Sequence, residues 1–158
     1  VLATPMTPAD VAVGEIAWAV CRGALYAVAF YVVLVVMGLA GSGWMVLSIL
    51  VAVVIGAAFA AVGLAATTYM RTWADFEYVT MITMPMLLFS GTFYPAASYG
   101  NMAWIVQLSP LYHGVALMRM ASFGAFQWSA LGHLAVLLTM FVVGLSIAAR
   151  RVTGLLIK

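Results

Sequence analysis

Few side chains in this sequence of 158 residues carry groups that could do chemistry. The two histidines, His113 and His133, could ligate a haem iron if facing helices held them at matched depth in a membrane. Their spacing does not require this arrangement, and an ordinary hydrogen-bonding role for each imidazole is the favoured interpretation. A membrane enzyme or haem-binding membrane protein that uses His113 and His133 stays open as an alternative function.

Other catalytic signatures are missing from the sequence. There is no phosphate-binding GxxxxGK[ST] loop and no HExxH zinc motif. Ser90 precedes Gly91 but lacks the glycine two residues earlier that a nucleophile elbow needs. The single cysteine, Cys21, excludes a disulfide framework and a cysteine-based zinc site. We therefore expect no catalytic residue, no metal and no cofactor in this chain.

The composition excludes most other classes of protein. Hydrophobic residues make up 67% of the chain and charged residues only 6%, whereas an average soluble domain carries about 25% charged residues. This excludes a soluble monomer and a disordered chain. The net charge of +2 is too small and too scattered for a nucleic-acid partner. The composition predicts an all-α, polytopic transmembrane helical bundle that forms a single domain over residues 1–158.

Long charge-free stretches predict the membrane spans. A helix needs about 20 apolar residues to cross a hydrocarbon core of roughly 30 Å. Four spans are expected, at about residues 16–39, 45–70, 79–95 and 130–149. Pro85 removes a hydrogen bond within the third span, and Ser90 and Gly91 follow, so that span is predicted to be kinked or broken.

Between the third and fourth spans, residues 96–125 are apolar but too interrupted to cross. The segment 101–108 and the segment 111–123 each predict a short helix, and Ser109 with Pro110 restarts the second one. Two short outer helices, either re-entrant or interfacial, are expected. On the second span, Gly56, Ala60, Gly63 and Thr67 predict one face that another helix can approach closely.

Basic residues predict the orientation. Four spans place the N-terminal segment, the 71–77 loop and the C-terminus on one side of the membrane. That side carries Arg71, Arg150, Arg151 and Lys158, whereas the other side carries only Arg119. The positive-inside rule makes the first side cytoplasmic. For Arg119, a side chain that reaches the membrane interface is favoured over a contact with lipid phosphate or an anionic substrate.

Methionines gather between residues 81 and 120 of the sequence. Met81, Met84, Met86, Met102, Met118 and Met120 are six of the eleven. Methionine is flexible and polarizable, so such a cluster suits a surface that accepts varied apolar ligands. Adaptable packing around broken helices is the favoured alternative.

Four motifs in order resemble one family of membrane proteins. They are Leu2–Asp10 followed by Gly14-Glu15, then Arg71–Phe76, then Leu88–Pro95, and then Leu108–His113. Together they resemble the type-2 ABC exporter permeases, and most closely the branch of lipooligosaccharide, nodulation-factor and drug exporters. The resemblance covers essentially the whole chain. Such permeases usually have six spans, so the chain, which starts at Val1 without methionine, is expected to lack the N-terminal part.

The resemblance implies a transport subunit and not an enzyme. Two permease chains, identical or different, would pair with two ABC ATPase subunits that bind ATP and Mg²⁺, in a bacterial plasma membrane and among its lipids. Export of a lipooligosaccharide or of an amphipathic drug is implied, and the sequence leaves the choice of substrate open. The residues implied at the ATPase contact are Thr4, Pro5, Thr7, Pro8 and Asp10, with Arg71, Asp75 and Glu77 as a lesser contact. The residues implied at the outer gate are Pro85, Ser90, Gly91, Pro95, Pro110, Tyr112 and His113.

Overall fold

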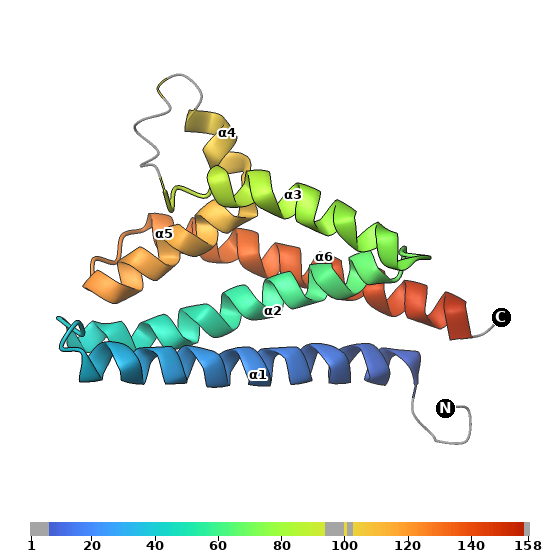
Figure 1. Ribbon diagram of the computed structural model, residues 1–158, viewed down its shortest axis with the longest axis horizontal. Coiled ribbons are helices and arrows are strands. Elements are labelled where there is room, and N and C mark those ends of the chain that lie inside the picture. The colour runs from blue at the N-terminus through green and yellow to red at the C-terminus, as the bar shows by residue number, and fades with distance from the viewer. Residues whose placement is uncertain (1–6, 94–99, 101–102, 157–158) are drawn as a thin grey trace.

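A computed structural model describes residues 7–93, 100 and 103–156 (Figure 1). In these residues all of the elements of regular structure are helices, which confirms the predicted all-α fold. The α-helices are α1 (Pro8–Val36), α2 (Leu47–Thr67), α3 (Phe76–Leu88), α4 (Ala103–Leu108), α5 (Pro110–Phe123) and α6 (Ser129–Leu156). Two short 3₁₀ helices, η1 (Gly43–Val46) and η2 (Trp73–Asp75), lead into α2 and α3.

Three helices in the described part of the chain are long and apolar enough to cross a membrane. They cover Asp10–Val36, Gly43–Thr67 and Ser129–Gly154, and they agree with three of the four expected spans. The apolar helices, together with the all-α fold, make this a membrane-embedded protein. The last helix was expected to end near residue 149, but α6 continues past Arg150 and Arg151 because arginine is a good helix former.

The third expected span differs from the prediction. Helix α3 has 13 residues and ends at Leu88, which makes it about 20 Å long and too short to cross alone. Pro85 lies in its last turn, where the missing N–H removes one hydrogen bond of the helix. The described residues therefore contain three helices of spanning length where four spans were expected, and a crossing near α3 stays a prediction.

The two short helices lie where the sequence predicted them. Ser109 separates α4 from α5, and Pro110 occupies the first turn of α5. Helix α5 ends at Phe123 and is capped by Gly124, whose φ of 67° is left-handed and where a β-carbon would lie 2.6 Å from the Trp44 ring. The buried residues of α5 face α2 and α6. Helix α5 is therefore part of the bundle, and the choice between a re-entrant and an interfacial position stays a prediction.

Helix α2 lies at the centre and contacts α1, α5 and α6 (Figure 1). Ala58 of α2, Leu117 of α5 and Leu137 of α6 form the buried core. Partly buried apolar side chains surround these three: Val51, Val54, Ile55, Ala130, Leu134, Met140 and Phe141. Helix α5 is therefore held by the same core that joins the two long helices.

Small residues let α2 and α6 approach closely, but on a different face from the one predicted. A β-carbon on Gly144 of α6 would lie 2.8 Å from the backbone of Ala61 and Val62. In contrast, a β-carbon on Gly56 or Gly63 would meet no other atom within 4 Å. No helix among the described residues covers Gly56 or Gly63, so a close helix partner for the face at residues 56, 60, 63 and 67 stays a prediction.

Helix α1 leaves most of its apolar surface uncovered. Ala12 and Ile16 are buried near its start, whereas Leu25 and Phe30 remain 66% and 65% exposed. Apolar side chains with this exposure suit a hydrocarbon environment or a further helix. This outer surface is what a helix in a lipid bilayer requires.

The two ends of the bundle differ in character. The start of α1, the turn that joins α2 to α3, and the last turns of α6 lie at one end (Figure 1). We call this the polar end. The turn at Ser90 and Gly91, helix α5 and the start of α6 lie toward the other end, which we call the histidine end.

Candidate functional site

At the polar end, Thr7 and Asp10 form a reciprocal cap at the start of α1. The backbone N–H and the hydroxyl of Thr7 donate to Asp10 Oδ2 at 2.8 and 2.7 Å, and the Asp10 N–H donates to Thr7 Oγ1 at 3.3 Å. Pro8 occupies the first turn, where its missing N–H costs nothing. The predicted contact residues Thr4 and Pro5 lie outside the described residues.

Asp75 orders the turn between α2 and α3 in a similar way. Its Oδ2 accepts hydrogen bonds from the backbone N–H groups of Arg71 at 2.7 Å and Thr72 at 3.0 Å. These two bonds, first that from Arg71, hold the pKa of the Asp75 carboxyl below its usual value. Glu77, in the first turn of α3, is exposed. The turn is thus closed by its own acidic residue and presents a second acidic residue to the outside.

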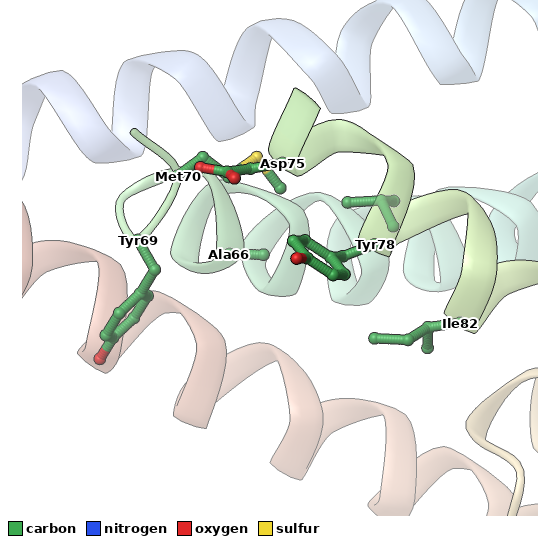
Figure 2. A pocket seen from close by; sticks show the side chains of 7 residues that line it. Ala66, Tyr69, Met70, Asp75, Tyr78 and Ile82 are labelled. Carbon is green, nitrogen blue, oxygen red and sulfur yellow. The ribbon is translucent and has the colours of Figure 1, made fainter. Parts of the chain in front are cut away.

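The two predicted contact segments share the polar end without binding each other. No hydrogen bond or ion pair joins Thr7 or Asp10 to the turn at residues 71–77 among the described residues. A pocket of about 400 Å³ lies where this turn meets α2 and α3. Figure 2 shows the side chains that line it: Ala66, Tyr69, Met70, Asp75, Tyr78, Val79 and Ile82.

Sequence reasoning missed one contact at this end. The Arg151 guanidinium lies 4.0 Å from the centre of the Tyr69 ring, and in Figure 2 the Tyr69 side chain reaches toward α6. This cation–π contact joins the end of α2 to α6. Both residues were expected at the same membrane edge, but nothing in the sequence says which arginine meets the ring.

At the histidine end, Ser90 closes the turn that follows α3. The side chain is fully buried, and its hydroxyl donates to the Leu87 carbonyl at 2.6 Å. The same oxygen lies 2.7 Å from Thr92 Oγ1 and accepts from the Thr92 N–H at 3.2 Å. Gly91 has a φ of 76°, a left-handed conformation that favours glycine. Ser90 therefore has a structural role and is not free to act as a nucleophile.

Arg119 of α5 binds this turn directly. Its Nη2 donates a hydrogen bond of 2.6 Å to the carbonyl of Gly91. The carbonyl end of α3 carries a partial negative charge, which favours a cation at this position. The contact joins α3 to α5 across 28 residues of sequence. For Arg119 a side chain that reaches the membrane interface was the favoured expectation over a contact with an anion, and no local pattern points to the carbonyl that it binds.

The two histidines bind each other. Nδ1 of His113 in α5 lies 2.6 Å from Nδ1 of His133 in α6, and Nε2 of His113 lies 2.9 Å from the carbonyl oxygen of Gln107. The Gln107 carbonyl only accepts, so His113 Nε2 carries a proton. In the uncharged pair His113 Nδ1 is then the acceptor, and His133 donates from Nδ1. The pair requires opposite tautomers of the two imidazoles.

This arrangement does not fit the haem alternative. Axial ligation places the iron between the two imidazole nitrogens, whereas a separation of 2.6 Å is a hydrogen-bond distance. Tyr112 also packs edge-on against both rings, with centroid distances of 5.7 Å to His113 and 5.9 Å to His133. No group of three or more potential metal ligands occurs in the part of the chain that the structure describes.

The residues predicted for the outer gate are brought together only in part. Ser90, Gly91 and Tyr112 line one pocket with Arg119, and His113 contacts Tyr112. Pro110 lies at the start of α5, and Pro85 lies in α3 before the turn. Pro95 lies outside the described residues.

The predicted methionine surface is dispersed in the structure. Met81 and Met84 are exposed on α3. Met118 lines a pocket with α1 and α2, and Met120 lines the separate pocket beside Arg119. Met102 lies outside the described residues. The methionines of this group that the structure describes thus lie on α3 and α5, and Met118 and Met120 line different pockets.

Comparison with protein families gives one match. The family model described as "ABC-2 type transporter" matches residues 1–123. The matched stretch contains the cap at Thr7, the turn at Asp75, the Ser90–Gly91 turn and the whole of α5. Helix α6, which supplies His133, lies beyond it. The match therefore covers every residue that was predicted for the two sites.

Curated relatives point the same way. The chain is 30% identical over 122 residues to "Nodulation protein J" of Sinorhizobium fredii (strain NBRC 101917 / NGR234), which covers 76% of this chain and 47% of that protein. It is 30% identical over 146 residues to the protein of the same name from Rhizobium leguminosarum bv. viciae, with 90% and 56% covered. The chain thus spans about half the length of these relatives. No solved structure shows a significant match.

Proposed function

The chain belongs to the ABC-2 type transporter family, and we propose that it is the permease subunit of an ATP-driven exporter. Family membership makes it a membrane subunit of an ABC transporter and a transport protein rather than an enzyme. The single observation that carries the proposal is the family match over residues 1–123. The three apolar helices of spanning length support it.

The proposal assigns ATP hydrolysis to a separate subunit. The family implies an ABC ATPase partner in general, and the sequence has no phosphate-binding loop of its own. ATP and Mg²⁺ then bind to that partner, and two permease chains assemble with two ATPases. The assembly lies in a bacterial plasma membrane with the polar end in the cytoplasm.

The polar end is the proposed contact with the ATPase. Thr7 and Asp10 cap α1, so a force on this cap acts directly on a helix of 29 residues. The turn closed by Asp75 acts on α3, and α3 is joined to α5 through Arg119. The first proposed contact also includes Thr4, Pro5 and Pro8. The second also includes Arg71 and Glu77.

The histidine end is the proposed outer gate. Movement of α3 reaches α5 through the bond from Arg119 to Gly91, and α5 reaches α6 through the histidine pair. The proposed gate also includes Pro85, Ser90, Pro95, Pro110 and Tyr112. The substrate is a lipid-linked or amphipathic molecule, either a lipooligosaccharide or a drug.

ATP-dependent transport by the full-length protein with its ATPase tests the proposal. Each substrate class is added to the medium around inside-out vesicles, and its uptake is measured with and without ATP. We expect uptake that requires ATP and the ATPase subunit. Transport that continues without ATP, or a purified protein that captures no ATPase, would contradict the proposal.

A matched pair of cap variants tests the contact. Thr7→Ala removes the hydroxyl that caps α1, and Ser42→Ala removes the hydroxyl that caps η1 at the other end, where Ser42 Oγ accepts from the Trp44 N–H at 3.2 Å. Each loss costs about 1 kcal/mol of local stability. Only Thr7→Ala is expected to lower substrate-stimulated ATP hydrolysis. An equal loss in both variants would show a general effect on folding.

A further inference from the structure

Arg119 is a cation without an acidic partner among the residues that the structure describes, which include every Asp and Glu of the sequence. The four acidic residues of the sequence are Asp10, Glu15, Asp75 and Glu77. They lie in the first turns of α1 and at the start of α3, which are at the polar end (Figure 1). Helix α5, which carries Arg119, lies toward the histidine end. Arg119 is exposed on α5 beside apolar helices, where a counter-charge stabilises a cation, and none of these four acidic residues lies at that end.

The Gly91 carbonyl accepts a hydrogen bond from only one of the nitrogens of the Arg119 guanidinium. It is neutral and accepts from Nη2, whereas an arginine side chain has five N–H donors and a full positive charge. The end of the α3 dipole adds a fraction of one charge. The remaining donors and most of the charge are therefore available for an anion.

A pocket of about 230 Å³ lies beside this guanidinium. Its polar side is formed by the Ser90–Gly91 turn, Tyr112 and Arg119. Its apolar side is formed by Val115, Ala116 and Met120. Pockets for complete small molecules measure about 300–1,000 Å³, so this pocket suits a headgroup and the first part of an apolar chain.

We propose that this pocket binds the anionic phosphate-type headgroup of an amphiphile through Arg119. The planar guanidinium matches two oxygens of a phosphate group. The wall formed by Val115, Ala116 and Met120 contacts the adjoining carbon chain. Arg119 also keeps its bond to Gly91, so headgroup binding and the position of the turn after α3 are linked through one side chain.

Two kinds of amphiphile carry a headgroup that fits this pocket. A bilayer lipid such as phosphatidylglycerol and an anionic amphipathic substrate both present an oxyanion next to an apolar chain. The site deepens the proposed function and rests on it for a role in transport, because Ser90, Gly91 and Tyr112 belong to the proposed gate. Binding itself requires neither ATP nor the ATPase.

Lipid binding to the purified full-length protein tests the site. The protein is exchanged into detergent with defined amounts of phosphatidylglycerol or phosphatidylcholine, and retained lipid is counted by native mass spectrometry. We expect the wild type to retain phosphatidylglycerol in preference. Arg119→Gln should lower the affinity at least about tenfold, the usual effect of losing a charged hydrogen bond, and Arg119→Lys should restore part of it.

Two further variants keep the test independent of folding. Ala116→Phe fills the apolar side of the pocket and leaves the bond from Arg119 to Gly91 in place, and it should also lower phosphatidylglycerol binding. Arg150→Gln removes one exposed positive charge at the polar end and should leave binding unchanged. Wild-type binding in Ala116→Phe, or an equal loss in Arg150→Gln, would overturn the proposal.

Competitors distinguish the sources of the headgroup. Displacement of phosphatidylglycerol by dodecyl phosphate indicates a site for anionic amphiphiles in general, and resistance to it indicates a site for the bilayer lipid. Displacement by millimolar inorganic phosphate alone would overturn the need for an apolar chain. If the wild-type protein transports with ATP but does not prefer phosphatidylglycerol, only this site is overturned. If it binds phosphatidylglycerol but does not transport, only the exporter is overturned.

Discussion

Proton positions on two imidazoles decide how α5 is held to α6. The Gln107 carbonyl requires a proton on His113 Nε2, and this leaves His113 Nδ1 as the acceptor for His133. The bond between α5 and α6 therefore needs a single proton between the two facing Nδ1 atoms, which His133 carries and His113 accepts.

The tautomers can be measured directly because the sequence contains only these two histidines. In protein labelled with ¹⁵N-histidine and free of a histidine tag, we expect one neutral imidazole protonated at Nε2 and the other at Nδ1. His133→Phe should release the remaining histidine from this constraint. Two Nε2-protonated rings in the wild type would contradict the arrangement.

A second prediction at this scale concerns Asp75. Hydrogen bonds from the N–H groups of Arg71 and Thr72 lower the pKa of its carboxyl in the folded protein. The carboxylate therefore stabilises the turn at neutral pH, and this stabilisation is lost as the pH falls through the folded-state pKa. Asp75→Asn should give faster hydrogen exchange of the Arg71 and Thr72 amides at pH 7.

The control for this variant is Glu77→Gln. Glu77 is exposed two residues later, so neutralising it changes the local charge equally without removing the acceptor of the two amides. Exchange at residues 71 and 72 should stay at the wild-type rate in Glu77→Gln. Equal acceleration in both variants would mean that charge, and not hydrogen bonding, orders the turn.

At the scale of elements, α5 contacts three other segments at the histidine end and so joins them to one another. Arg119 joins it to the turn after α3, His113 joins it to α6, and Gly124 lies against Trp44 of η1. A helix of 14 residues is thus tied to three other segments by contacts of different kinds. Its position should respond when any one of these segments moves.

The contact between α2 and α6 predicts opposite effects for two glycine substitutions in one helix. Gly144→Ala places a β-carbon 2.8 Å from the α2 backbone, and overpacking of this kind costs about 1–3 kcal/mol. Gly132→Ala has open space, so the better helix former should stabilise by up to about 1 kcal/mol. Thermal unfolding of the full-length protein in detergent measures both. A lower melting temperature for Gly132→Ala than for Gly144→Ala would contradict the packing.

At the scale of the whole molecule, charge is separated along the bundle. The elements at the polar end carry Asp10, Arg71, Asp75, Glu77, Arg150 and Arg151, whereas α5, which carries Arg119, lies toward the opposite end (Figure 1). The positive-inside rule then predicts a cytoplasmic polar end. This orientation also places the proposed ATPase contact on the side where ATP is available.

Cysteine labelling in intact cells tests this orientation. In a Cys21→Ala background, Gln127→Cys lies in the exposed turn before α6 and Glu77→Cys lies at the exposed start of α3. A membrane-impermeant maleimide should label Gln127→Cys in intact cells, and Glu77→Cys only after permeabilisation. The reverse pattern would place the polar end outside.

Much of the fold follows from local physics and was predictable. Charge-free stretches indicate apolar helices because a charge in hydrocarbon is costly, and three of them have spanning length. Ser109 and Pro110 mark the boundary between α4 and α5 because proline favours a first helical turn. Thr7 and Asp10 cap α1 for the same local reason. These features depend on residues only a few positions apart.

What only the tertiary structure decided depends on residues that are far apart in the sequence. The Gly91 carbonyl bound by Arg119, the His113–His133 pair and the α2 face against Gly144 all depend on how helices are rotated and aligned. A sequence pattern shows that a helix has an apolar or a small-residue face, but several faces of an all-apolar helix look alike. Composition and local spacing determined a helical membrane protein with two different ends. Packing alone decided which side chains meet there, because close contact selects one rotation of each helix among several that are equally apolar.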